Sequence, residues 1–198
     1  MARLTREQSQ ALTREKLLRS ASDVVAREGY DGASVDRIAE DAGFSKGAFY
    51  SNFSSKDDVL LQMLESNAGS DVEALAELLH DVSDPDAVIE QVAAWSDSRA
   101  GELKWGIIAI EFLRRARRDD TLDERKRGLF VSQWEGVGAL LLEKLFPDRQ
   151  PAIAPLDLGG IVLELTYGGI SSFLGTDTTA GQMVRTVLRA FRASAQVS

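Results

Sequence analysis

The sequence contains no cysteine, and its only histidine is His80. Disulfide bonds and thiolate metal sites are therefore excluded, and a histidine-based metal centre has too few ligands. Proline is also scarce, and three of the four prolines fall within residues 147–155, which form the clearest predicted linker. We expect no metal and no other cofactor.

Long apolar runs and catalytic motifs are missing as well. The longest apolar stretches are interrupted by Glu111, Glu143 or Glu164, and the first sixteen residues are mostly polar. The sequence therefore predicts neither a membrane-spanning helix nor a signal peptide, and a cytoplasmic location fits it. No HExxH motif, no pair of Glu-x-x-His motifs and no phosphate-binding loop occurs, and the GVG at 136–138 follows no predicted strand. We expect no catalytic residues and no enzyme.

Acidic residues outnumber basic ones over the whole chain but not in the N-terminal segment. The net charge is -8, which argues against a protein whose whole surface binds nucleic acid. Residues 1–22 nevertheless carry five basic and two acidic side chains, whereas residues 68–198 carry fourteen basic and twenty acidic ones. This asymmetry indicates either a basic face on an acidic body or simply a solvated start of a helix.

Apolar residues recur at helical spacing along the whole chain, and no segment shows a convincing strand pattern. The fold class predicted is all-α, with a three-helix N-terminal domain, a helical C-terminal domain and about nine helices in total. The expected helices cover residues 10–29, 34–43, 45–53, 55–79, 85–101, 103–118, 122–146, 156–174 and 179–194. The segment 103–118 is apolar almost all round, so we expect it to lie centrally in the C-terminal domain.

Residues 34–53 have the pattern of a helix-turn-helix. Two short helices, capped by Ser34 and Ser45, are separated by Gly43. Val35, Ile38, Ala39 and Phe49 form the packing side, and the outward side of the second helix holds small and polar residues: Lys46, Gly47, Ala48, Tyr50, Ser51 and Asn52. A helix whose outer side carries such small and polar residues can enter the major groove of DNA.

The segment DGASVDRIAEDAGFSKGAFYSNFSSKDDVLLQMLE resembles the DNA-binding domain of the TetR (tetracycline repressor-like) family. The resemblance covers about residues 12–65 and implies that the third helix reads the major groove. It also implies that the residues matching Tyr50 and Lys56 hold phosphates. Family members often carry histidine at the position of Asn52 and threonine at that of Ala48, so no base preference carries over.

The predicted DNA contacts combine both arguments. The residues are Ser34, Arg37, Ser45, Lys46, Gly47, Ala48, Tyr50, Ser51, Asn52 and Lys56. Ser34 can equally well be only the cap of its helix. Lys56 lies near the positive end of a helix dipole, and a nearby phosphate would relieve that mismatch. We expect residues 1–54 to form the DNA-binding domain and residues 55–198 the second domain, with the fourth helix linking the two.

The resemblance implies that the second domain binds a small-molecule effector. Candidate ligand contacts are Trp95, Trp105, Glu111, Phe112, Phe130, Trp134 and Tyr167. Aromatic residues at helical spacing are more often core packing, so each of them can be core instead. Glu111 is the most informative of them, because a carboxylate within IIAIEFL needs a partner, which can be a ligand or an arginine.

The last two helices carry more apolar surface than one edge of a domain can cover. The resemblance implies that they form a four-helix bundle with their symmetry mates in a homodimer. The residues concerned are Leu158, Ile161, Val162, Leu165, Phe173, Val184, Val187, Leu188 and Phe191. The alternative is that these residues pack within the chain.

These inferences predict a ligand-responsive transcriptional regulator that binds a pseudo-palindromic DNA operator as a homodimer. A repressor that a small hydrophobic or amphipathic effector releases from DNA is the interpretation we favour. The alternatives are an activator or co-repressor-type regulator, and a helical ligand-binding or adaptor protein without DNA binding. No membrane partner is expected.

Overall fold

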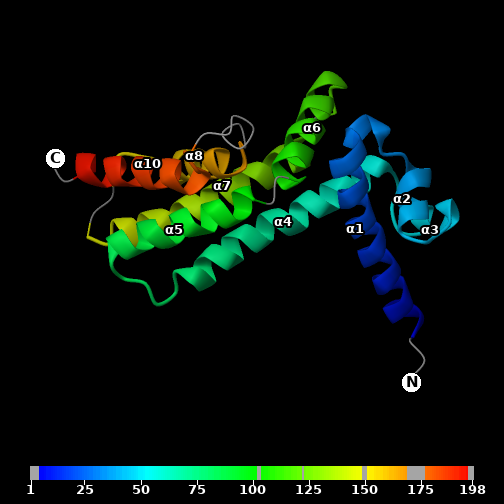
Figure 1. The fold of residues 1–198 in the computed structure, drawn as a ribbon, viewed down its shortest axis with the longest axis horizontal. Helices are drawn as coiled ribbons and strands as arrows, with labels where there is room; N and C mark the ends of the chain where they lie inside the picture. Colours follow the sequence, from blue (N-terminus) through cyan, green and yellow to red (C-terminus); the bar gives the residue numbers. More distant parts are fainter. Residues whose placement is uncertain (1–4, 102–103, 122, 149–150, 169–176, 196–198) are drawn as a thin grey trace. The chain divides into compact units, whose positions relative to one another are not determined.

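The computed structural model describes residues 5–101, 104–121, 123–148, 151–168 and 177–195. Throughout these residues the regular structure is α-helical, which confirms the predicted fold class (Figure 1). The described helices are α1 (Arg6–Gly32), α2 (Val35–Asp41), α3 (Lys46–Tyr50), α4 (Lys56–Leu78), α5 (Pro85–Ala100), α6 (Lys104–Arg118), α7 (Glu124–Leu145), α8 (Pro155–Tyr167) and α10 (Ala180–Ala195). None of the described helices is both long enough and apolar enough to cross a lipid bilayer.

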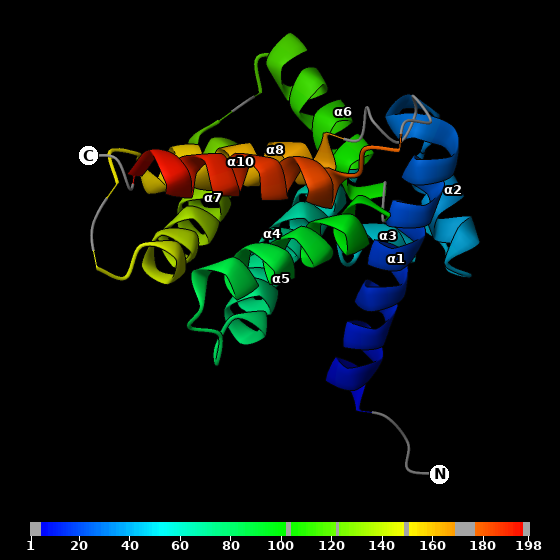
Figure 2. The same ribbon diagram turned by 60° about the vertical axis from the view of Figure 1, so that its left-hand side comes forward.

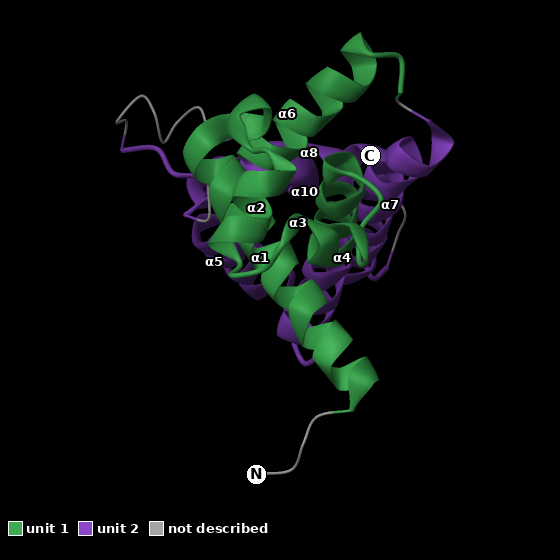
Figure 3. Cartoon of the chain, turned by 90° about the vertical axis from the view of Figure 1, so that its right-hand side faces the viewer, with its two compact units in different colours: residues 1–66, 107–122 green, residues 67–106, 123–198 purple. Residues whose placement is uncertain are grey.

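The chain forms two compact units (Figure 3). Unit 1 comprises Met1–Ser66 and Ile107–Leu122, and unit 2 comprises Asn67–Gly106 and Asp123–Ser198. These units differ from the predicted division after residue 54, because the first part of α4 and most of α6 group with the N-terminal helices. Both α4 and α6 therefore contribute residues to each unit.

In unit 1, α1 starts earlier than its apolar pattern suggests. The side chain of Thr5 accepts a hydrogen bond from the main-chain N–H of Gln8, and the Gln8 side chain accepts one from the N–H of Thr5. This capping box satisfies two donors that a helix start leaves free. The predicted end at Gly29 is a kink, since Gly29 has a φ of 73° and a last helical turn continues to Gly32.

The two short helices of unit 1 begin at the predicted caps. Ser34 accepts from the N–H of Arg37, and Ser45 accepts from the N–H of Ala48. Helix α3 is shorter than the expected 45–53, because it ends at Tyr50. Side-chain donors of the next two residues bind the Gly47 and Ala48 carbonyls, and such bonds compete with continuation of a helix.

The predicted position of α6 in the centre of the C-terminal domain is wrong in two respects. From Ile107 onward, α6 belongs to unit 1. Its surface is two-sided rather than apolar all round, since Ile108 and Phe112 are buried whereas 49% of Ile110 is exposed.

Unit 2 is a bundle in which α7 packs along α8 and α5 packs along α10 (Figure 2). Its core is made by buried aliphatic residues of α4, α5, α7, α8 and α10, together with Trp95. Helices α7 and α8 approach very closely where Gly138 faces Pro155 and where Gly159 faces Trp134. A Cβ atom at either glycine would overlap the carbonyl oxygen of the facing residue. These glycines therefore set the distance between the two helices.

Candidate nucleic-acid interface

The second helix of the helix-turn-helix is held in place by an aromatic cluster. Phe49 is fully buried, and its ring lies 5.6 Å from the ring of Tyr50, edge to face, and 5.6 Å from that of Phe53. Ile38 and Ala39 of α2 are buried as well. One side of α3 is therefore committed to the core of unit 1, and the opposite side is left for a partner.

The opposite side of α3 is exposed and carries few bulky side chains. Tyr50 is 52% exposed, and Lys46, Gly47 and Ser51 are also exposed. A Cβ at Gly47 would have only the Ser45 hydroxyl oxygen nearby, at 3.7 Å. The helix can thus come close to a flat or grooved surface, with the Tyr50 hydroxyl projecting from it.

Lys46 is paired within the protein. Its Nζ lies 2.8 Å from a carboxylate oxygen of Asp36, and this hydrogen bond raises the pKa of Lys46 above its ordinary value. More than half of each side chain is exposed, so the pair is of the weak surface kind. Lys46 is therefore charged, and a phosphate or a base edge can compete with Asp36 for it.

Asn52 is half-buried rather than free to reach outward. Its Nδ2 donates to the carbonyl oxygen of Ala48 at 2.8 Å, and its Oδ1 is buried without a hydrogen-bond partner among the described residues. The main-chain carbonyl of Asn52 accepts from Arg14, whose guanidinium also lies 4.6 Å from the centre of the Phe53 ring. Arg14, one of the basic residues counted at the N-terminus, therefore supports α3 from inside the unit.

Lys56 also makes internal contacts. Its Nζ donates to the carbonyl oxygen of Tyr30 at 2.6 Å and lies 4.1 Å from the centre of the Tyr30 ring. Burial, and then repulsion by Arg115, lowers the pKa of Lys56. The mismatch of this lysine with the dipole of α4 is thus relieved by a carbonyl and a ring of α1. The phosphate contact remains a prediction.

Ser34 and Arg37 lie on the exposed side of α2. The cap role of Ser34 is confirmed, since its Oγ is 3.2 Å from the Arg37 nitrogen. The Arg37 guanidinium binds Glu28 at 2.9 Å, and this hydrogen bond lowers the pKa of the Glu28 carboxyl. Both residues remain open to solvent on the same unit as α3.

The sequence reasoning missed a polar groove beside α3. One wall comes from α1 and its cap and the other from the end of α3, with the residues Thr5, Arg6, Ser9, Gln10, Thr13, Ala48, Ser51 and Asn52 lining it. The signal was present in the sequence, because the α1 residues are polar and recur every three to four positions. The groove extends the predicted contact surface from α3 onto α1.

The comparisons with known proteins concern this same region. Residues 17–63 match the family model described as "Bacterial regulatory proteins, tetR family". This segment of the chain is therefore a TetR-family domain.

A curated relative of this chain is the HTH-type transcriptional repressor AcnR of Corynebacterium diphtheriae, which is 34% identical over 67 residues. That match covers 34% of this chain and 35% of the relative. The matched segments span only about a quarter to a third of the first curated relatives. The matches are to transcriptional regulators, which agrees with the expectation that the chain is not an enzyme.

Solved structures share the whole fold. The chain superimposes on a TetR-family regulator from Mesorhizobium loti with a TM-score of 0.72 and 17% identity, covering 96% of this chain and 98% of the other. It superimposes on FadR from Bacillus subtilis, solved in complex with stearoyl-CoA, with a TM-score of 0.65 and 16% identity. That comparison covers 89% of this chain and 96% of FadR.

The predicted ligand contacts are divided between the two units. Glu111 and Phe112 belong to unit 1, where Phe112 is buried and Glu111 accepts a hydrogen bond from the main-chain N–H of Tyr30. One carboxylate oxygen of Glu111 is therefore already hydrogen-bonded to the backbone, and a role of Glu111 in ligand binding stays a prediction. The side chain of Trp105 lies outside the described residues.

The four remaining candidates, Trp95, Phe130, Trp134 and Tyr167, all belong to unit 2. Trp95 is 9% exposed, and the other three are half-buried. Trp134 packs with its ring against Gly160 of α8. Their role in ligand binding stays a prediction.

A buried polar cluster in unit 2 was not foreseen. Asp71 of α4 is fully buried, and one of its carboxylate oxygens accepts from Gln133 at 2.9 Å and from the Tyr167 hydroxyl at 2.6 Å. The other oxygen lies 3.2 Å from Nε of Arg99. Burial, and then the hydrogen bond to Asp71, raises the pKa of the Tyr167 hydroxyl, which therefore remains a donor. The cluster ties α4, α5, α7 and α8 together.

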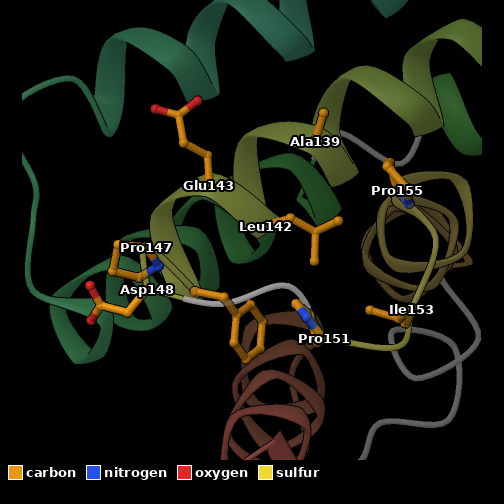
Figure 4. A pocket seen from close by; sticks show the side chains of 9 residues that line it. Ala139, Leu142, Glu143, Pro147, Asp148, Pro151, Ile153 and Pro155 are labelled. Carbon is orange, nitrogen blue, oxygen red and sulfur yellow. The ribbon is translucent and has the colours of Figure 1, made fainter.

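Unit 2 also has a surface hollow of about 870 Å3 at the end of α7 (Figure 4). Leu142 of α7 and Ile153 lie on two sides of it, and the prolines at 147, 151 and 155 complete much of the rim. None of the predicted ligand contacts lines this hollow. It coincides instead with the predicted proline-rich linker.

Part of the predicted dimer surface is wrong. Leu158, Val162, Val184 and Leu188 are at most 1% exposed and belong to the core of unit 2. A side chain that its own chain already covers has no surface to offer a second copy. Ile161, Leu165, Val187 and Phe191 are half-buried and stay candidates, whereas Phe173 lies outside the described residues.

Proposed function

We propose that the chain is a TetR-family transcriptional regulator that inserts α3 into the major groove of double-stranded DNA. The observation that carries the proposal is the division of α3 into two sides. Phe49 is fully buried, whereas the next residue, Tyr50, is 52% exposed among small and polar neighbours. A helix fixed by its inner side and lined outside by Lys46, Gly47 and Ser51 has the shape and donors for groove and phosphate contacts.

The regulator acts as a homodimer on a pseudo-palindromic operator. Two copies of α3 then read half-sites spaced by about 34–36 Å or a multiple of that length. The half-buried apolar residues Ile161, Leu165, Val187 and Phe191 are the surface we assign to pairing. The net charge of -8 restricts binding to this local surface, because the rest of the chain repels phosphate.

An effector bound in unit 2 lowers the affinity for the operator. Thermodynamic linkage then requires that the operator lowers the affinity for the effector by the same factor. The stearoyl-CoA in the Bacillus subtilis structure supports a fold of this kind holding an amphipathic small molecule. Repression with release by effector is the mode of action that we favour over activation.

A mobility-shift assay with the promoter region that flanks the protein's own gene tests the proposal. We expect a retarded complex whose affinity falls steeply as salt rises, because phosphate contacts release counterions. A chain that retards no promoter fragment at low salt is an adaptor or a ligand-binding protein rather than a regulator.

The substitution Gly47→Glu should abolish DNA binding and has a matched control. The space beyond Gly47 is open apart from the Ser45 hydroxyl oxygen at 3.7 Å, so the variant should fold. Its carboxylate would face the DNA phosphates and should abolish the retarded complex. Gly47→Ala, which adds no charge, is the control, and helicity by circular dichroism should be the same for both. Unchanged DNA binding by Gly47→Glu would contradict the proposed orientation of α3.

A further inference from the structure

We propose that the polar groove between α1 and α3 is a second DNA contact, in which Arg6, Ser9 and Gln10 of α1 hold the phosphate backbone of one strand. This inference adds a binding site to the regulator described above and rests on that proposed function. It is carried by a face of α1 that continues beyond the protein core, and by side-chain donors on that face that have no partner among the described residues.

The first turns of α1 extend beyond the other helices of unit 1 (Figure 3). From Leu17 onward, one face of α1 packs into the core of this unit. Arg6, Gln10 and Thr13 precede Leu17 at spacings of three and four residues, so they continue the same face. At 1.5 Å per residue, this polar face runs for about 16 Å before the core begins. The core leaves it uncovered, and it is available to a partner outside the chain.

The end of α3 closes the other side of this face. The groove between them has a volume of about 760 Å3, and Ala48, Ser51 and Asn52 form its second wall. Ala48 and Ser51 also lie on the side of α3 that is predicted to face DNA. A duplex that receives α3 in its major groove would therefore bring the strand that borders the major groove against α1.

The groove offers hydrogen-bond donors that the protein does not use. The Thr13 hydroxyl already donates to the carbonyl oxygen of Ser9, at 2.9 Å. The side chains of Arg6, Ser9 and Gln10, by contrast, have no hydrogen-bond partner among the described residues. Arginine, serine and glutamine are among the side chains that bind phosphate oxygens in protein–DNA complexes. These three donors therefore suit a phosphate backbone.

Charge favours an anion in the groove. Arg14 and Arg19 of the same helix have internal partners, since Arg14 donates to the carbonyl oxygen of Asn52 at 2.9 Å and Arg19 pairs with Glu15 at 3.0 Å. Arg6 has no such partner among the described residues, and it lies in the first turn of α1, where the helix dipole disfavours a cation. None of the described residues that line the groove is acidic, so no carboxylate there competes for a phosphate position.

Arg6→Gln tests the contact in the full chain, by fluorescence anisotropy with a labelled duplex that the chain retards. Loss of one phosphate contact should lower the affinity about five- to tenfold near 0.1 M salt. It should also reduce the slope of log affinity against log salt by about one. The loss should be similar for every operator variant, because a phosphate does not identify its base.

Arg19→Gln is the matched control, because it removes the same charge from the opposite face of the same helix. The Arg19 side chain is 73% exposed, so this variant should fold. Its salt slope should stay close to that of the unmodified chain. Equal reductions for the two variants would show that the charge of Arg6 acts only from a distance and would overturn the inference.

Gln10→Glu keeps the shape of an exposed side chain and replaces its free donor group with a carboxylate. It should weaken binding at least as much as Arg6→Gln, and unchanged or stronger binding would contradict a phosphate at this position. Phosphate ethylation interference then locates the contact. Arg6→Gln should lose the interference at one phosphate beside the bases that α3 contacts, and an unchanged pattern would also overturn the inference.

The outcomes separate this contact from the proposed role of α3. If Gly47→Glu abolishes binding while Arg6→Gln behaves as Arg19→Gln does, the role of α3 stands and the groove contact fails. If Arg6→Gln has the predicted effect while Gly47→Glu binds normally, the groove contact stands and the proposed orientation of α3 fails. A chain that retards no duplex at low salt overturns both.

Discussion

The carboxylate of Glu111 accepts a hydrogen bond from the main-chain N–H of Tyr30, with 2.6 Å between Oε2 and the nitrogen. The bond exists because Gly29 has a φ of 73° and interrupts α1 just before Tyr30. It fastens α6 to the end of α1 within unit 1. The same tyrosine offers its carbonyl oxygen to Lys56 and its hydroxyl to Asp57 of α4. Arg115 of α6 adds an ion pair with Asp31 at 2.7 Å.

Removal of the Glu111 carboxylate should destabilise unit 1. Glu111→Ala leaves a partly buried N–H without a partner, and we expect the free energy of unfolding to fall by about 1–3 kcal/mol. Glu111→Gln retains an acceptor oxygen and should lose clearly less. Urea unfolding followed by circular dichroism measures both variants. Equal stability of Glu111→Ala and the unmodified chain would show that the bond contributes nothing.

Tyr50 should contribute to DNA affinity without contributing much to stability. Because it is 52% exposed, Tyr50→Ala should change the free energy of unfolding by roughly 0.5 kcal/mol or less. Its loss should weaken the binding of every operator variant by a similar factor, as expected for a phosphate contact. Fluorescence anisotropy with a set of labelled operators checks this. A loss confined to one base position would assign Tyr50 to base reading instead.

Lys46 should behave differently, because its ammonium can reach a guanine edge once it leaves Asp36. Lys46→Ala should then cost about 1–3 kcal/mol on operators with the correct guanine and much less on operators where that base is replaced. Asp36→Asn, which frees the lysine, serves as the matched variant and should strengthen binding. Equal losses for Lys46→Ala on all operators would place the residue on a phosphate.

Two glycines of α7 should respond in opposite ways to alanine. A Cβ at Gly138 would overlap the carbonyl oxygen of Pro155, so Gly138→Ala should lower the free energy of unfolding by about 3 kcal/mol or more. Gly128 has open space around its Cβ position, and Gly128→Ala should raise stability by roughly 0.5–1 kcal/mol through helix propensity. Thermal unfolding measures the pair. A neutral Gly138→Ala would mean that α7 and α8 can separate easily.

Stability in acid should depend on Glu90. This residue of α5 binds Arg185 and Arg189 of α10, both at 2.9 Å, and the hydrogen bond from Arg185 lowers its pKa below the ordinary 4.5. A carboxyl with a lowered pKa in the folded state stabilises the fold above its unfolded pKa. That contribution is lost as pH falls through the folded value.

Glu90→Gln should therefore show a flatter decline of stability below about pH 4.5 than the unmodified chain. Urea midpoints across the acid range measure the decline. Glu77→Gln, which changes an exposed glutamate of α4, is the control and should follow the unmodified profile. Parallel profiles for Glu90→Gln and the unmodified chain would show that the pair does not couple protonation to folding.

The local signals in the sequence predicted the helices well. The caps at Ser34 and Ser45 and the break at Gly43 are all found where expected. Such features depend on residues three or four apart, so one sequence suffices to find them. The early start of α1 at Thr5 was missed, although its capping box has the same local character.

The long-range contacts could not be predicted in this way. Asp71 meets Gln133 and Tyr167 from positions 62 and 96 residues away, and no periodic pattern encodes that meeting. Similarly, Leu158 and Val184 repeat at helical spacing whether they face their own chain or a second copy. Only the fold distinguishes the core from the dimer surface.

The glycine contacts between α7 and α8 also bear on motion. Because facing carbonyl oxygens occupy the Cβ positions of Gly138 and Gly159, a rotation or slide that brought a larger residue to either contact would make its side chain collide with the facing backbone. This pair is therefore a stiff frame within unit 2. A displacement within unit 2 is more easily taken up by α4 or α5, whose side chains meet the frame through contacts such as those of Asp71 with Gln133 and of Ser96 with Thr166.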